Sequence, residues 1–200
     1  MSGAALRLRD VACLRGERLL FRGVSLDIGP GGAALLTGPN GIGKSSLLRL
    51  CAGLLRPYAG SVECEGAMAM SDERLALDQD ASLERALGFW AGLDGAPPES
   101  VGAALDAMAL SPLRQVPVRM LSTGQRKRAM LARVIASGAP IWLLDEPGNG
   151  LDDGSLSRLG DAIGAHLERG GILLAASHQP LPLPAAMTIE LSDYVPQVAG

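Results

Sequence analysis

The residues best suited to chemistry form a glycine-rich segment, Gly38–Ser45, whose sequence is GPNGIGKS. The segment matches the pattern GxxxxGK[ST] in full, and it lies between an apolar run and a segment with helical spacing of leucines. Glycines let backbone N–H groups approach phosphate oxygens, Lys44 can reach the β- and γ-phosphates, and the Ser45 hydroxyl can bind Mg²⁺. The pattern predicts a phosphate-binding site formed by Gly38, Pro39, Asn40, Gly41, Ile42, Gly43, Lys44, Ser45 and Ser46.

A second candidate is a pair of carboxylates that follows the apolar run Ile141–Leu144. Asp145 is placed to hold Mg²⁺ beside the phosphate loop, directly or through water. Glu146 lies one residue farther on and can polarise an attacking water as a general base. Because the same chain carries a phosphate loop, we interpret the pair as catalytic rather than as a solvated strand end.

A third candidate is the sequence LSTGQ at Leu121–Gln125. Ser122 is a good N-cap for the helix expected over residues 126–137. A serine hydroxyl, a glycine N–H and a helix N-terminus together can bind a phosphate, although a plain capped helix would have the same sequence. The phosphate loop already serves one nucleotide, so we expect this second clamp to act on a nucleotide held by another copy of the chain.

The elements that must position these residues alternate between strands and helices. Three continuous apolar runs fit strands that are buried on both faces of a parallel sheet: Ala33–Leu36, Ile141–Leu144 and Ile172–Ala176. Helices are expected over Lys44–Leu55 and Ser155–Arg169, and the alternation of strand and helix predicts a doubly wound α/β core. Residues near the start alternate between apolar and polar, which predicts an antiparallel pair of strands that contains Leu6, Leu8, Val24, Leu26 and Ile28.

The alanine-rich segment from about residue 67 to residue 136 is expected to form a helical subdomain inserted in this core. With 200 residues, the chain is expected to be one domain over 1–200. Its net charge of −3 argues against a nucleic-acid partner. Its apolar runs are far shorter than the ~20 residues that cross a bilayer, and it begins without a signal-peptide pattern. We therefore expect a cytosolic chain unless other subunits hold it at a membrane.

The order and content of these motifs resemble the ATP-binding cassette (ABC) family over nearly the whole chain. Gly38–Ser45 resembles the Walker A motif of that family, and Ile141–Glu146 its Walker B motif with the catalytic glutamate. Leu121–Gln125 resembles the LSGGQ signature, with Thr123 in place of the first glycine. The resemblance implies a P-loop cassette and a Mg²⁺-dependent ATPase coupled to transport.

The resemblance also implies roles for two further segments. Asp152, in Gly150-Leu151-Asp152, resembles the D-loop residue that crosses to a partner subunit, and His178 the switch histidine that contacts the γ-phosphate. The family pairs two cassettes head to tail around two ATP molecules, which implies a homodimer. The implied site is then catalytic Lys44, Glu146 and His178, the Mg²⁺ ligands Ser45 and Asp145, and, acting on the partner's nucleotide, Ser122, Thr123, Gly124 and Gln125.

More narrowly, several segments resemble the ATPase subunits of cytochrome c maturation (heme exporter) complexes, among them Cys13–Gly16, Phe89-Trp90, Gln125–Arg128, Trp142–Pro147 and Ser177–Pro180. That resemblance implies membrane subunits of the CcmB type, a peripheral position on the cytoplasmic face of the inner membrane, and ATP-driven delivery or release of heme. Another small ABC exporter, or a non-transport ABC ATPase, remains an alternative. No direct heme binding is expected, since the cysteines lack the CxxCH pattern.

Two further departures from the family pattern leave functional details open. Arg15 stands where many cassettes stack an aromatic ring on adenine, which leaves base selectivity open. The Q-loop glutamine has no clear counterpart, and Glu73 or Gln79 is the candidate.

Overall fold

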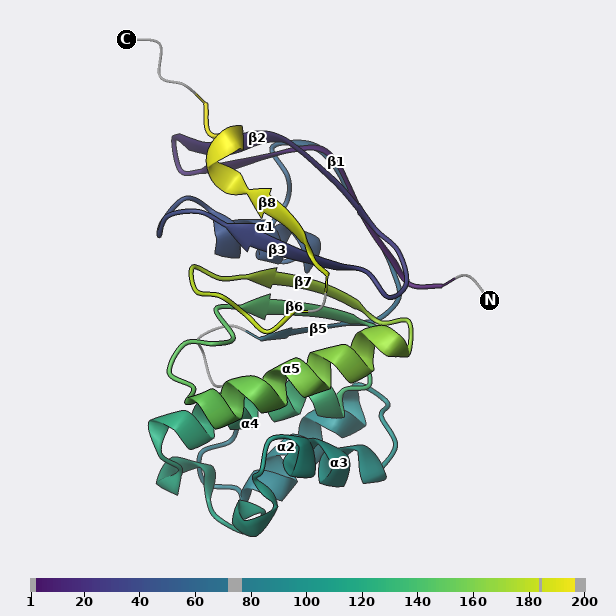
Figure 1. Ribbon diagram of the computed structural model, residues 1–200, viewed down its shortest axis with the longest axis vertical. Helices are drawn as coiled ribbons and strands as arrows, with labels where there is room; N and C mark the ends of the chain where they lie inside the picture. Colours follow the sequence, from purple (N-terminus) through teal and green to yellow (C-terminus); the bar gives the residue numbers. More distant parts are fainter. Residues whose placement is uncertain (1–2, 72–76, 184, 197–200) are drawn as a thin grey trace.

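The computed structural model describes residues 3–71, 77–183 and 185–196. Figure 1 shows a central parallel sheet with an antiparallel sheet toward one end of the molecule and a group of helices at the other. The antiparallel sheet has the order β2-β1-β4. Its strands are β1 (Ala5–Arg15), β2 (Arg18–Ile28) and β4 (Ala59–Glu65). Leu6 pairs with Ile28 and Leu8 with Leu26, which confirms the antiparallel pair predicted from the alternating pattern.

The central sheet is parallel throughout, with the order β5-β6-β7-β3-β8. Its strands are β3 (Ala33–Thr37), β5 (Met68–Ser71), β6 (Ile141–Asp145), β7 (Ile172–Ala176) and β8 (Met187–Glu190). Every residue of β6 and β7 is buried, as the continuous apolar runs predicted. The predicted α/β fold class is confirmed.

Alternate residues of β6 and β7 face two separate cores. Ile141 and Leu143 pack with α1 (Lys44–Cys51) and the antiparallel sheet, whereas Trp142 and Leu144 pack with the helical layer. That layer contains α2 (Leu83–Leu93), α3 (Glu99–Ala107), α4 (Thr123–Ala136) and α5 (Asp153–Glu168). Short 3₁₀ turns cover Ser111–Leu113, Val118–Met120 and Leu191–Tyr194. Among the described residues, no helix has the length and apolar character to cross a bilayer.

Two predicted boundaries are wrong. The helical subdomain does not begin at residue 67, because Met68–Ser71 forms strand β5 and pairs with β6 from Ile141 to Leu144. Alanine and methionine favour a helix locally, but pairing with a buried strand overrides that preference. Helix α1 ends at Cys51 rather than at Leu55 because Gly53 adopts a φ of +70°, a conformation that stops a helix.

Candidate nucleotide-binding and hydrolysis site

The phosphate loop joins β3 to α1 through glycines in left-handed backbone conformations. Gly38 has a φ of +127° and Gly43 a φ of +120°. A Cβ atom on Gly43 would lie 3.0 Å from the ring of Phe21, so this position requires glycine. Gly43 is also the N-cap of α1, and no side chain caps that helix. The first N–H groups of α1 are therefore available to an anion.

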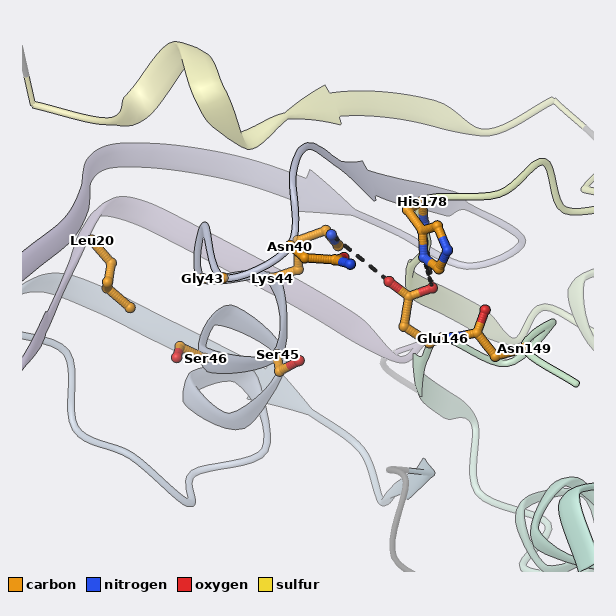
Figure 2. Close-up of a pocket in the computed structure, with 10 residues that line it drawn as sticks. Leu20, Asn40, Gly43, Lys44, Ser45, Ser46, Glu146, Asn149 and His178 are labelled. Atoms are coloured by element: carbon orange, nitrogen blue, oxygen red, sulfur yellow. Dashed lines mark hydrogen bonds and ion pairs between the residues drawn. The ribbon is translucent and has the colours of Figure 1, made fainter.

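Six of the nine predicted phosphate-binding residues line a cavity of about 330 Å³ (Figure 2), and Gly38, Pro39 and Ile42 are not among its lining residues. The loop and the start of α1 contribute Asn40, Gly41, Gly43, Lys44, Ser45 and Ser46, while Leu20, Glu146, Asn149 and His178 come from other segments. Lys44 is only 6 % exposed, and its Nζ atom donates a hydrogen bond to the Gly38 carbonyl at 2.7 Å. The structure thus brings the phosphate loop, Glu146 and His178 together from three distant parts of the sequence.

Glu146 lies at the centre of this arrangement. Its carboxylate is 3.7 Å from Lys44 Nζ through Oε1 and 2.8 Å from His178 Nδ1 through Oε2, and Figure 2 draws both contacts. A carboxylate oxygen accepts hydrogen bonds, so the His178 tautomer with its proton on Nδ1 suits this contact. The Glu146 backbone has a φ of +47°, and its N–H donates to the Ala176 carbonyl at the end of β7. The carbonyl of Glu146 accepts from Lys127 Nζ at 2.8 Å.

The two predicted Mg²⁺ ligands, Ser45 and Asp145, carry oxygen atoms of the kind that Mg²⁺ prefers. Ser45 lines the cavity, whereas Asp145 is a buried carboxylate at the end of β6 that is not among the lining residues. Within the described ranges, no group of three or more His, Cys, Asp or Glu side chains could hold a metal ion. One hydroxyl and one carboxylate fit Mg²⁺, which takes oxygen ligands and completes its shell with water and substrate phosphates.

The LSTGQ residues lie elsewhere. Ser122 and Gln125 form a complete capping box at the start of α4: Gln125 N donates to Ser122 Oγ at 3.3 Å, and Ser122 N donates to Gln125 Oε1 at 2.8 Å. Thr123 lines a separate hollow of about 460 Å³ with Gln79, Arg126, Lys127, Met130, Asn149 and Gly150. The capped-helix interpretation therefore holds within one chain, and the action on a partner's nucleotide stays a prediction.

Two further residues have clear local roles. Asp152 caps α5 by accepting a hydrogen bond from Ser155 N at 2.8 Å, and hydrogen bonding to Ser155 lowers the pKa of Asp152. His166 lies in the last turn of α5 and is buried. It stacks on Trp142 with ring centroids 3.9 Å apart, and its Nε2 lies 3.1 Å from the Ile172 carbonyl. Burial lowers the pKa of His166, which fits packing rather than catalysis.

Of the residues named for the departures from the family pattern, the structure describes Gln79 and Arg15. Glu73 lies outside the described residues. Gln79 donates to the Leu77 carbonyl at 3.2 Å and lines the hollow beside α4, not the phosphate cavity. Arg15 lies at the exposed end of β1 and is not one of the cavity residues. Sequence reasoning missed Leu20, whose only signal is its position directly before Phe21, the residue that packs against Gly43.

Comparison with known proteins identifies the family. Residues 21–149 match the family model described as ABC transporter. The chain belongs to the ABC transporter family. The cassette is 54 % identical to the cytochrome c biogenesis ATP-binding export protein CcmA of Novosphingobium aromaticivorans, a match that covers 98 % of this chain and all of that protein. It is 53 % identical to CcmA of Zymomonas mobilis over 96 % of this chain and 86 % of that protein.

Solved structures agree on the fold of the cassette. A putative ABC transporter ATP-binding protein from Pyrococcus furiosus superposes with a TM-score of 0.84 at 24 % identity, over 96 % of this chain and all of that chain. A nucleotide-free ATP-binding cassette from an ABC transporter gives a TM-score of 0.73 at 21 % identity, over 88 % of this chain and 82 % of that chain. At these identities the similarity establishes the ABC cassette architecture.

Proposed function

We propose that this cassette is the Mg²⁺-dependent ATP-hydrolysing subunit of a membrane complex for cytochrome c maturation, which exports heme or releases it to a heme chaperone. The observation that carries the ATPase assignment is the Glu146 carboxylate, which faces the phosphate cavity between Lys44 and His178. The names of the relatives, cytochrome c biogenesis ATP-binding export protein CcmA, support the transport role.

In the proposed reaction the open N–H groups of α1 and the Lys44 ammonium bind the ATP phosphates. Mg²⁺, held by Ser45 and Asp145, would neutralise charge that develops on the phosphate oxygens. Glu146 accepts a proton from a water molecule while the oxygen of that water attacks the γ-phosphorus of ATP. The bond between the γ-phosphorus and the oxygen that bridges it to the β-phosphate then breaks. The products are ADP and inorganic phosphate. His178 is proposed to contact the γ-phosphate, and its hydrogen bond with the Glu146 carboxylate supports that role.

The proposed complete site needs a second copy of the cassette. Ser122–Gln125 do not line the phosphate cavity of their own chain, so their proposed ligand is the nucleotide of a partner in a twofold dimer. Asp152 of the D-loop is proposed to face the same interface. Membrane subunits of the CcmB type are the proposed transport partners, with the cassette at the cytoplasmic face of the inner membrane.

The substitution Glu146→Gln tests the ATPase assignment. Loss of a general base is expected to slow phosphate release by roughly 10²–10⁴-fold, while ATP binding persists and an ATP-bound dimer accumulates in size-exclusion chromatography. The matched control is Glu63→Gln, because Glu63 is an exposed carboxylate on β4. A Glu146→Gln protein that hydrolyses ATP at the wild-type rate and stays monomeric with ATP would refute both the general base and the dimer.

A complementation experiment tests the transport role. In a bacterium that lacks its own CcmA, the wild-type chain is expected to restore c-type cytochromes detected by heme staining, and Glu146→Gln is not. An active ATPase that fails to restore them would favour the alternative, a different small ABC exporter.

A further inference from the structure

The only two lysines of the chain both contact Glu146. Lys44 approaches the carboxylate, and its place in the phosphate loop accounts for that contact. Lys127 has no part in the motif assignments. It belongs to α4, two residues after the LSTGQ segment, and its Nζ donates to the backbone carbonyl of Glu146 at 2.8 Å. This contact joins the helix that carries the LSTGQ residues to the general base of the same chain.

The Glu146 backbone needs such support. Its φ of +47° is uncommon for a residue with a long side chain, and conformations of this kind persist only where the surroundings hold them. Three hydrogen bonds do so: the Glu146 N–H donates to Ala176, and the Glu146 carbonyl accepts from Lys127 Nζ and, at 3.2 Å, from Asn149 N. Of these, only the Lys127 contact comes from another layer of the fold.

We propose that Lys127 is a positioning residue that orients Glu146 and transmits to it the state of the neighbouring nucleotide site. The inference rests on the proposed function, in which residues at the first turn of α4 bind the partner's nucleotide. A small movement of that turn would displace Lys127 Nζ from the Glu146 carbonyl and rotate the carboxylate away from Lys44 and His178. Hydrolysis in one site then depends on occupancy of the other through a contact within a single chain.

The main test is Lys127→Met in the full-length chain, since methionine has a similar length and no donor. We expect kcat to fall roughly 10- to 100-fold, the scale of a misplaced catalytic group, with an unchanged Kd for ATP and loss of cooperativity in ATP. Lys127→Arg keeps a cationic donor to the single carbonyl, and is expected to restore most of kcat. Arg128→Gln is the matched control, because Arg128 also donates from α4 to backbone carbonyls, those of Met108 and Ala109. It should lower the melting temperature without changing kcat per folded molecule.

A second readout does not require activity. The chain has two histidines, so the ring resonances of His178 and His166 can be followed by NMR. Because His178 Nδ1 is bonded to Glu146, Lys127→Met is expected to shift the His178 resonances and leave those of the buried His166 unchanged. If Lys127→Met does not fold, Lys127→Leu, which also lacks a donor, takes its place with the same expected shift.

The outcomes separate the two proposals. A wild-type chain without ATPase activity, alone or with its membrane subunits, would refute the proposed function. An active wild type with an equally active Lys127→Met, or unmoved His178 resonances, would overturn the role of Lys127 alone. A fall in kcat that Lys127→Arg does not relieve would also overturn it, since a donor at that position would then not be what matters.

Discussion

Helices α1 and α4 both begin where a phosphate is proposed to bind, yet their first turns are built in opposite ways. The N-cap of α1 is Gly43, which offers no side chain, so the first N–H groups lack a side-chain cap. The N-cap of α4 is Ser122, and its capping box with Gln125 is complete within the chain. The start of α1 is thus organised for a ligand, whereas the start of α4 is stable without one. The Ser122 hydroxyl accepts from Gln125 N and still has its own proton to donate to a phosphate.

Of the changes to these two helices, the largest effect is expected at the N-terminus of α1, and Lys44→Met tests it. Removing a charged donor to phosphate costs about 1.5–3 kcal/mol, so ATP is expected to bind roughly 10- to 100-fold more weakly in isothermal titration calorimetry. The melting temperature without nucleotide should change little by comparison. Arg49→Gln removes a positive charge from the other end of α1 and is the control. Equal ATP affinity in Lys44→Met and the wild type would contradict the assignment of the phosphate loop.

Ser122→Ala tests the N-terminus of α4, which is capped by residues of the same chain. Loss of the N-cap is expected to lower the free energy of unfolding by about 0.5–2 kcal/mol in urea denaturation. ATP affinity of the monomer should stay the same because Ser122 does not line the phosphate cavity of its own chain. ATP hydrolysis should fall as well, since the same hydroxyl is proposed to bind the partner's nucleotide. A drop in monomer affinity would instead mean that the LSTGQ segment acts on the nucleotide of its own chain.

The smallest expected effect concerns His166, which lies in the last turn of α5, away from both N-termini. Burial lowers the pKa of His166 below the ordinary value of about 6.5. The unfolded chain therefore binds a proton more readily, and the free energy of unfolding is expected to decrease as pH falls from about 6.5 to the folded-state pKa. Above about pH 6.5 both states are neutral and His166 contributes no pH dependence. His166→Phe should remove this part of the pH profile; an unchanged profile would contradict it.

Much of this molecule could be predicted from local patterns. The runs at Ala33–Leu36, Ile141–Leu144 and Ile172–Ala176 became strands because no side of them contains a polar residue that could face water. The same reasoning failed at Met68–Ser71, where a short helix-favouring sequence lies against β6 and is decided by its neighbour. Leu20 and Asn149 escaped prediction because neither carries a chemical signal and both reach the cavity from separate loops or strands.

The sequence by itself determined the chemistry available to this protein: the glycines and lysine of the phosphate loop, the carboxylates after a buried strand and the capped LSTGQ helix. These features depend on residues adjacent in the chain, whose backbone geometry and hydrogen bonding are local. Only the tertiary structure decided how they meet. Glu146 lies between Lys44, His178 and Lys127, and a left-handed backbone holds it there. Contacts between residues so far apart in the chain arise from the packing of a parallel sheet between two cores, which no local pattern specifies.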